Sequence, residues 1–301
     1  MEMTDISINA EKKRAKMKKF LLSLFCVFLF SVNGWAQEEK CWFDDIRYLC
    51  KTKDGKPYTG FSVIYSKEGW KQAEANFVDG KLLGDFKFYN SQGKLIEQGT
   101  YLEETLFHGG TAKIGYVPIA SYISYYPNGQ IKEKGGNYKD CDGQGGITKE
   151  GHWTEYYENG VLKSDGNYKT QMYGNPAFCR SKENGRWLYS SEKRPEISWE
   201  YTYVNGVKEG SYVRSLRISP QEVITLVEGT YANGKTVGDW KTYYPDGNLW
   251  RERHYNTEGK PVGLWICYDS DGKSKTLKAE EALRLVLGCW SRPNHELYSL
   301  E

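Results

Sequence analysis

The cysteines are the residues of this sequence whose possible chemistry is easiest to define. Six of the seven lie outside an apolar N-terminal run: Cys41, Cys50, Cys141, Cys179, Cys267 and Cys289. Thiolates can hold a metal, but no Cys-x-x-Cys pair and no cluster of histidines accompanies them, so we expect no zinc site. An even number of cysteines in an exported chain favours disulfides. Free buried thiols are the alternative.

The other side chains with catalytic potential form no recognisable constellation. The chain has four histidines, His108, His152, His254 and His295. No nucleophile–base arrangement accompanies them, and we expect His152 at the surface. Acidic pairs such as Asp44-Asp45 are interpreted as solvated charge, and the glycine-rich stretch 143–146 lacks the Lys-Ser/Thr of a phosphate-binding loop. We therefore expect no enzyme activity, no cofactor and no metal.

The first 36 residues have the pattern of a secretory signal peptide. A basic run precedes the apolar stretch Phe20–Val32, and the small residues Gly34 and Ala36 stand before a cut at Gln37. The apolar stretch has 13 residues, fewer than the ~20 that a membrane-spanning helix needs. We expect cleavage after Ala36 and a periplasmic or extracellular mature chain. An uncleaved anchor is the alternative, and either Met1 or Met17 is the true start.

Composition excludes several classes of protein. The chain of 301 residues contains 32 glycines, 24 tyrosines and 10 tryptophans. The long Val/Ile/Leu runs of buried parallel strands are absent after residue 36, and the abundant aromatic residues argue against disorder. The leader carries six basic and three acidic side chains, which leaves 35 basic and 36 acidic groups in the mature chain. No electrostatic case for nucleic-acid binding remains.

Aromatic residues and glycines recur in phase along the chain. Five segments carry an aromatic residue, a tyrosine three positions later and a glycine seven positions later: Phe86, Tyr89, Gly93; Tyr122, Tyr125, Gly129; Trp153, Tyr156, Gly160; Trp240, Tyr243, Gly247; and Trp265, Tyr268, Gly272. Three of them add a second tyrosine at the next position: Tyr126, Tyr157 and Tyr244. Equivalent aromatic residues, such as Trp240 and Trp265, are 25 residues apart. Such a fixed period indicates a repeat protein.

Turn chemistry predicts that each repeat is a β-hairpin. Asn-Gly and Asp-Gly pairs, such as Asp246-Gly247, separate segments rich in Tyr, Trp, Thr and Val. We interpret the glycines as turns and unit starts. The predicted fold is all-β: an elongated single-layer antiparallel β-meander of stacked hairpins with a period of about 25 residues. Alternation along a strand places rings on both faces, where ring ladders replace an aliphatic core.

The sequence phrases 231–240 and 238–249, which include Gly-Asp-Trp-Lys-Thr-Tyr-Tyr-Pro-Asp-Gly, resemble MORN repeats. More closely, they resemble the bacterial MORN-variant proteins named YwqK-family antitoxins. The resemblance covers roughly residues 58–273 and is specific in the copies that begin at Gly84, Gly151, Gly238 and Gly263. It implies an interaction role and, as one specific version of that role, immunity against a partner toxin.

Three joints are longer than the repeat requires: 102–121, 139–150 and 169–184. We expect them to be loops on one face of the sheet. The last two contain Cys141 and Cys179, and proximity in this layout favours the pairs Cys41–Cys50, Cys141–Cys179 and Cys267–Cys289. Two unrelated flexible loops are the alternative. Near-helical spacing of apolar residues predicts a short helix over Lys278–Leu287, ended by Gly288, which caps the last hairpin or docks a partner.

The predicted organisation has four parts: a signal peptide (1–36), an N-terminal cap segment (37–57), the repeat domain (58–274) and a C-terminal helical cap and tail (275–301). Tyrosine and tryptophan dominate binding hot spots. We therefore expect an exported, non-catalytic scaffold that binds another protein through its sheet face or inserted loops. A membrane- or glycan-binding envelope module is the alternative.

Overall fold

A computed structural model describes residues 42–44, 49–102, 107–108, 111–112, 119–140, 147–173, 178–279 and 297. The predicted signal peptide and most of the N-terminal cap segment lie outside these residues. Every element of the described residues is a β-strand. In this part of the chain, no helix has the length and apolar character needed to cross a bilayer.

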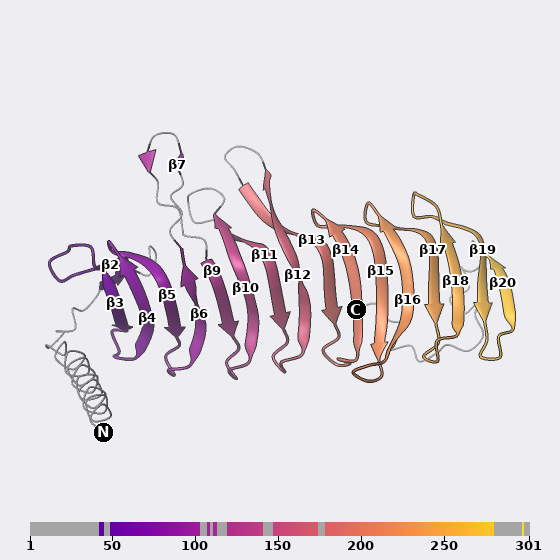
Figure 1. The fold of residues 1–301 in the computed structure, drawn as a ribbon, viewed down its shortest axis with the longest axis horizontal. Helices are drawn as coiled ribbons and strands as arrows, with labels where there is room; N and C mark the ends of the chain where they lie inside the picture. The colour runs from indigo at the N-terminus through magenta and orange to yellow at the C-terminus, as the bar shows by residue number, and fades with distance from the viewer. Residues whose placement is uncertain are drawn as a thin grey trace, which may run out of the picture.

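Sixteen strands form one open antiparallel meander in which each strand pairs with the next along the chain (Figure 1). The first half contains β3 (Gly60–Tyr65), β4 (Lys71–Val78), β5 (Lys81–Tyr89), β6 (Leu95–Tyr101), β9 (Ile119–Tyr125), β10 (Ile131–Asp140), β11 (Ile147–Tyr156) and β12 (Leu162–Tyr173). The second half contains β13 (Phe178–Ser190), β14 (Ile197–Val204), β15 (Val207–Arg217), β16 (Val223–Ala232), β17 (Lys235–Tyr243), β18 (Leu249–Tyr255), β19 (Pro261–Tyr268) and β20 (Ser274–Lys278). The predicted all-β meander is confirmed.

Four short strands lie outside this meander. The hairpin of β1 (Trp42–Asp44) and β2 (Leu49–Lys51) joins the sheet through a single pairing of Leu49 with Lys81 at the start of β5. The hairpin of β7 (Phe107–His108) and β8 (Thr111–Ala112) forms a separate two-stranded sheet. It lies within the first of the three long joints.

In the other two joints, the described residues are extended strands rather than loops. Tyr138 pairs with Lys149 and Asp140 with Ile147, so β10 and β11 continue well past the repeat. In the same way, the pairing of β12 with β13 continues as far as Tyr173. The expectation of loops was wrong here because continued backbone pairing satisfies the N–H and C=O groups that a loop would leave to solvent.

Turn chemistry follows the sequence closely. In the hairpin between β17 and β18, the Gly247 amide donates to the Tyr244 carbonyl at 2.9 Å, and Gly247 has a φ of 86°. Pro245 therefore occupies the first central position of a type I turn, followed by a left-handed glycine. Asn205 and Asn233 have positive φ angles of 50° and 49°, each directly before a glycine, as tight two-residue hairpins require.

Mid-strand glycines hold the aromatic rings of what we call the aromatic face, the side of the sheet that carries Phe86, Trp153, Trp187 and Trp240. A Cβ atom added to Gly135 would lie 2.2 Å from the Trp153 ring, and one added to Gly166 would lie 2.3 Å from the Trp187 ring. Gly229 lies in the same way under Trp240, and Gly99 lies close to Phe86. The sequence interpretation, which gave glycines only to turns and unit starts, missed this role.

A second tyrosine in the repeat joins consecutive units. The hydroxyls of Tyr126 and Tyr244 donate at 2.9 Å to the backbone carbonyls of Tyr156 and Tyr268. Tyr157 makes the equivalent contact with Ser190 at 3.3 Å. In each case the acceptor lies three residues after the aromatic residue of the next unit. These hydrogen bonds fix neighbouring hairpins relative to one another.

The C-terminal prediction needs correction. Lys278, the expected first residue of a capping helix, ends strand β20, and a helix has no support because 280–287 and Gly288 lie outside the described residues. Leu297 packs against Ile197, Leu216 and Leu226 on β14, β15 and β16. Leu297 therefore lies several strands back along the sheet, far from the last hairpin.

Candidate binding surface

The middle of the aromatic face, over β6 and β9–β12, differs from the regions on either side of it. At the N-terminal end, Cys50 and Tyr58 pack with Phe77 and Leu82 in one apolar cluster. On the other side, over β14, β15 and β16, Leu297 completes another. Among the described residues, the middle strands contact mainly their neighbours in the sheet. We call this stretch, defined by Glu97, Tyr122, Glu133, Lys149, Trp153 and Glu155, the central strip.

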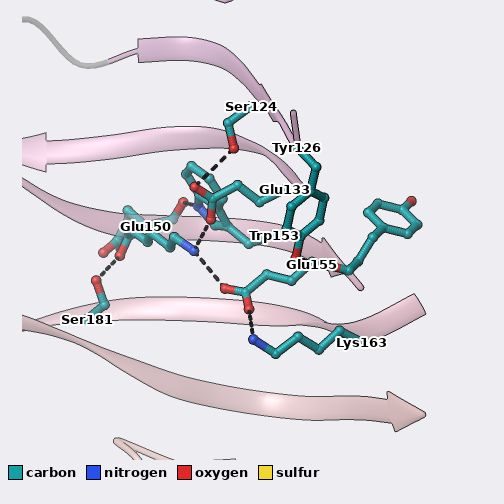
Figure 2. A network of polar contacts seen from close by, with 10 residues as sticks. Ser124, Tyr126, Glu133, Glu150, Trp153, Glu155, Lys163 and Ser181 are labelled. Carbon is teal, nitrogen blue, oxygen red and sulfur yellow. Dashed lines mark hydrogen bonds and ion pairs between the residues drawn. The ribbon is translucent and has the colours of Figure 1, made fainter. Parts of the chain in front are cut away.

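Two carboxylates face each other across the central strip. Glu133 on β10 is the direct cross-strand partner of Glu155 on β11, an arrangement that repels unless a cation intervenes. The Lys149 ammonium group supplies the cation, with Nζ 2.5 Å from Glu133 Oε2 and 2.8 Å from Glu155 Oε1 (Figure 2). Lys163 approaches the other oxygen of Glu155 at 3.4 Å, and the Ser124 hydroxyl reaches Glu133 at 3.5 Å.

The titration behaviour of this network follows from burial and pairing. Burial alone would lower the pKa of Lys149, but its bonds to Glu133 and Glu155 outweigh this effect and raise the pKa above its ordinary value. For Glu155, burial would raise the pKa, but the bond to Lys149 lowers it. Lys149 and Glu155 are therefore both ionised across the neutral range. Charges fixed in this way present a defined electrostatic pattern to a ligand.

Glu97 adds a third carboxylate to the central strip. Burial, followed by the nearby charge of Glu133, raises the pKa of Glu97 above its ordinary value. The charge of Lys132 and a hydrogen bond with Tyr122 lower this pKa, but they do not outweigh burial and Glu133. The same two causes, burial and then the Glu133 charge, raise the pKa of the Tyr138 hydroxyl. Burial thus disfavours the ionised form of Glu97.

Backbone contacts hold the aromatic floor of the strip. The Trp153 ring is fully buried, and its Nε1 donates to the Glu150 carbonyl at 3.1 Å. The Lys149 ammonium group lies 4.7 Å from the centre of that ring. On the next strands, the Thr170 amide donates to the Glu150 carboxylate and the Ser181 hydroxyl donates at 2.8 Å to the Lys149 carbonyl. The strip is therefore rigid before any ligand binds.

The opposite face carries the histidines that the structure describes in full. His152 Nε2 lies 3.1 Å from Asp165 Oδ1, which also accepts from the Thr154 hydroxyl. His254 Nδ1 lies 2.6 Å from Asp239 Oδ1. The His152 side chain is mostly exposed, as predicted. Within the described ranges, no three metal-ligating side chains come together; His295 lies outside them, as does the side chain of His108.

The structure describes three of the six candidate disulfide cysteines. Cys50, Cys179 and Cys267 are all buried, in separate parts of the sheet. Cys179 Sγ lies 3.5 Å from the Thr148 hydroxyl, so the extended hairpins β10–β11 and β12–β13 lie side by side there. The expected partners Cys41, Cys141 and Cys289 lie outside the described residues, and the pairing stays a prediction.

The repeat-defining residues occupy equivalent places in each hairpin. Phe86, Trp153, Trp240 and Trp265 are buried on the aromatic face. The tyrosines three positions later lie on the opposite face, where Tyr243 donates to Glu228 at 2.6 Å and Tyr89 receives the Lys71 ammonium group. The glycines of the hairpin turns have positive φ angles: Gly93, Gly129, Gly160, Gly247 and Gly272.

Each strand pair with this geometry is a small self-similar unit, and four of these units are similar to a known family. Four segments match the MORN repeat variant family. The matched residues are 82–103, 120–140, 149–170 and 236–257. Three of these MORN repeats are consecutive hairpins that form the central strip. A search of curated proteins finds no match, and the antitoxin assignment has no support beyond the resemblance.

Proposed function

We propose that this chain is an exported, non-catalytic MORN-repeat scaffold that binds another protein through the central strip. MORN repeats are commonly modules that bind proteins or membranes. The observation that carries the proposal is the strip itself: partly exposed, fixed charges lie over a rigid, buried aromatic floor at the middle of the sheet. Rigid aromatic surfaces of this kind lose little entropy on binding.

Export rests on the N-terminal sequence. The basic run, the apolar stretch and the small residues before Gln37 support cleavage after Ala36 and a periplasmic or extracellular location. Disulfides between Cys41 and Cys50, Cys141 and Cys179, and Cys267 and Cys289 would suit that compartment. The burial of the three described cysteines supports this proposal. Non-reducing peptide mapping of the exported chain tests the disulfide pairing. Three linked pairs of peptides are expected, and free thiols would contradict the pairing.

A protein is favoured over a lipid or a glycan as the ligand. The mature chain carries nearly equal numbers of acidic and basic groups, and the central strip contributes three carboxylates, which anionic headgroups would repel. A membrane- or glycan-binding envelope module is the second candidate, since exposed aromatic rings also stack on sugars. Immunity against a toxin is a specific form of protein binding that rests on family resemblance.

Two lysines on opposite faces provide a matched test. The side chains of Lys163 and Lys241 are 49% and 42% exposed, and each makes one loose ion pair, at 3.4 Å and 4.0 Å. Only Lys163 lies at the central strip. The immobilised exported chain is expected to capture a specific protein from envelope extract, to lose it in Lys163→Glu and to keep it in Lys241→Glu.

The other outcomes of this capture are equally informative. Recovery of lipid or polysaccharide alone would favour the second candidate function. Equal capture by the two variants would show that the central strip is not the binding surface.

A further inference from the structure

The two ends of the sheet have edge strands of opposite character. β20, with sequence Ser-Lys-Thr-Leu-Lys, carries two lysines, a common way to prevent an edge from pairing with another chain. β3, at the other end (Figure 1), has the sequence Gly-Phe-Ser-Val-Ile-Tyr and carries no charge and no proline. Among the described strands, β3 pairs only with β4. Within the part of the chain that the structure describes, no strand, charge or proline protects its outer edge.

Side chains on β3 are exposed in a pattern that a partner strand would cover. Phe61, Val63 and Tyr65 are 57%, 37% and 53% exposed, while Ser62 and Ile64 between them are buried. An uncharged edge strand with three exposed apolar side chains on one face is a surface for strand addition. These three residues lie on the opposite face of the sheet, away from the central strip.

The backbone of β3 has the alternation that strand addition needs. In an antiparallel pair, every second residue directs its N–H and C=O groups away from its partner. The Phe61 carbonyl accepts the Tyr58 hydroxyl at 2.8 Å, which assigns Phe61 to the outward set. Val63 and Tyr65 follow with the period of two. The exposed side chains and the outward backbone groups thus belong to the same three residues.

We propose that β3 pairs antiparallel with β3 of a second copy of this chain, so that two sheets join into one. Opposite residues of an antiparallel pair share a face, which allows a two-fold axis to pass through Val63. In that register Val63 lies opposite Val63 of the second copy, and Phe61 lies opposite Tyr65. The overlap places aromatic against aromatic and β-branched against β-branched residues, the favoured cross-strand pairs, and opposes no like charges. This self-complementarity selects a second copy over an unrelated peptide.

Sedimentation of the naturally processed chain tests the pairing. The wild-type chain is expected to show twice the monomer mass, and Val63→Lys to show the monomer mass, since the two-fold axis brings the two new charges together. Val207→Lys is the matched control: Val207 is 44% exposed, but it lies on β15, which is paired on both sides. It is expected to keep the dimer. A cooperative thermal unfolding transition shows that each variant folds.

Cysteine cross-linking tests the register. Residues opposite each other in a hydrogen-bonded pair have Cα atoms about 5.5 Å apart, within disulfide range. Val63→Cys is therefore expected to form a covalent dimer on mild oxidation. The two copies of Phe61 are about 13 Å apart in this register, four residues along the strand, so Phe61→Cys alone should not cross-link.

Three results would overturn the proposal. The first is a monomeric wild-type chain at about 100 µM, a concentration at which even a dimer with a Kd of about 10 µM is mostly formed. The others are a dimer that survives Val63→Lys, and a Phe61→Cys variant that cross-links as fast as Val63→Cys. None of them bears on the central strip, so this test and that of the proposed function fail independently.

Discussion

Adding one methyl group to Gly135 should disrupt the packing that stands in for a hydrophobic core. The new Cβ would lie 2.2 Å from Trp153 Cδ2 and 2.4 Å from Cε2, whereas carbon atoms pack at about 3.5–4.0 Å. The ring would have to move outward by more than about 1 Å. It has little room, because it is fully buried and lies 4.8 Å from the Tyr138 ring, centre to centre.

The cost of Gly135→Ala follows from three contributions. Overpacking a tight site costs about 1–3 kcal/mol. Loss of the hydrogen bond from Trp153 Nε1 to the Glu150 carbonyl adds about 1 kcal/mol. Replacement of glycine returns about 0.4–1 kcal/mol by restricting the unfolded chain. We expect a net loss of about 2 kcal/mol in the free energy of unfolding.

The next residue is an internal control for this prediction. A Cβ on Gly136 would meet nothing closer than 3.9 Å, and neither glycine has a positive φ. Gly136→Ala should therefore be neutral or stabilise by up to about 1 kcal/mol. The assay is urea unfolding followed by circular dichroism, with hydrogen exchange of the β9–β12 amides to detect local opening. Equal effects of the two substitutions would refute the packing argument.

Three further changes test the charge network and the contacts between repeats. Lys149→Met should lower the free energy of unfolding by about 2 kcal/mol, which is less than for a fully buried ion pair because the groups are partly exposed. Adding Glu133→Gln to that variant should restore part of the lost stability. An additive loss in the double variant would contradict the bridging role of Lys149. Glu97→Gln should stabilise the chain at neutral pH. Because the pKa of Glu97 is raised in the folded state, wild-type stability is lost as pH rises from the ordinary glutamate value through the folded pKa, and urea midpoints measured across that window should show this fall in the wild type and not in the variant. Tyr244→Phe removes one hydrogen bond between repeats and should lower the urea midpoint by the equivalent of about 1 kcal/mol with an unchanged m-value; no change would show that the hydroxyl bond is dispensable.

The architecture could be predicted from the sequence because turn chemistry is local. Asp246-Gly247 fixes a hairpin by its own φ preferences, whatever surrounds it. The glycines that hold the rings were missed because their role depends on a neighbouring strand. Gly99, Gly166 and Gly229 each stand two residues before a tyrosine, and this recurrence was the one sign of them in the sequence.

The central strip could not be predicted because it depends on strand register. Glu133 and Glu155 are 22 positions apart and meet only through the pairing of β10 with β11. Lys149 reaches both because β10 and β11 continue as strands where a loop was expected. The prediction that a capping helix begins at Lys278 was wrong for a related reason. Lys278 continues the strand pairing with β19, and this pairing outweighs the helical spacing of the residues that follow.

The most direct test of the proposed function is hydrogen exchange of the exported chain with and without its captured protein partner. We predict that protection on binding is concentrated in β6 and β9–β12, the strands of the central strip. Protection confined to the opposite face or to the ends of the sheet would contradict the account.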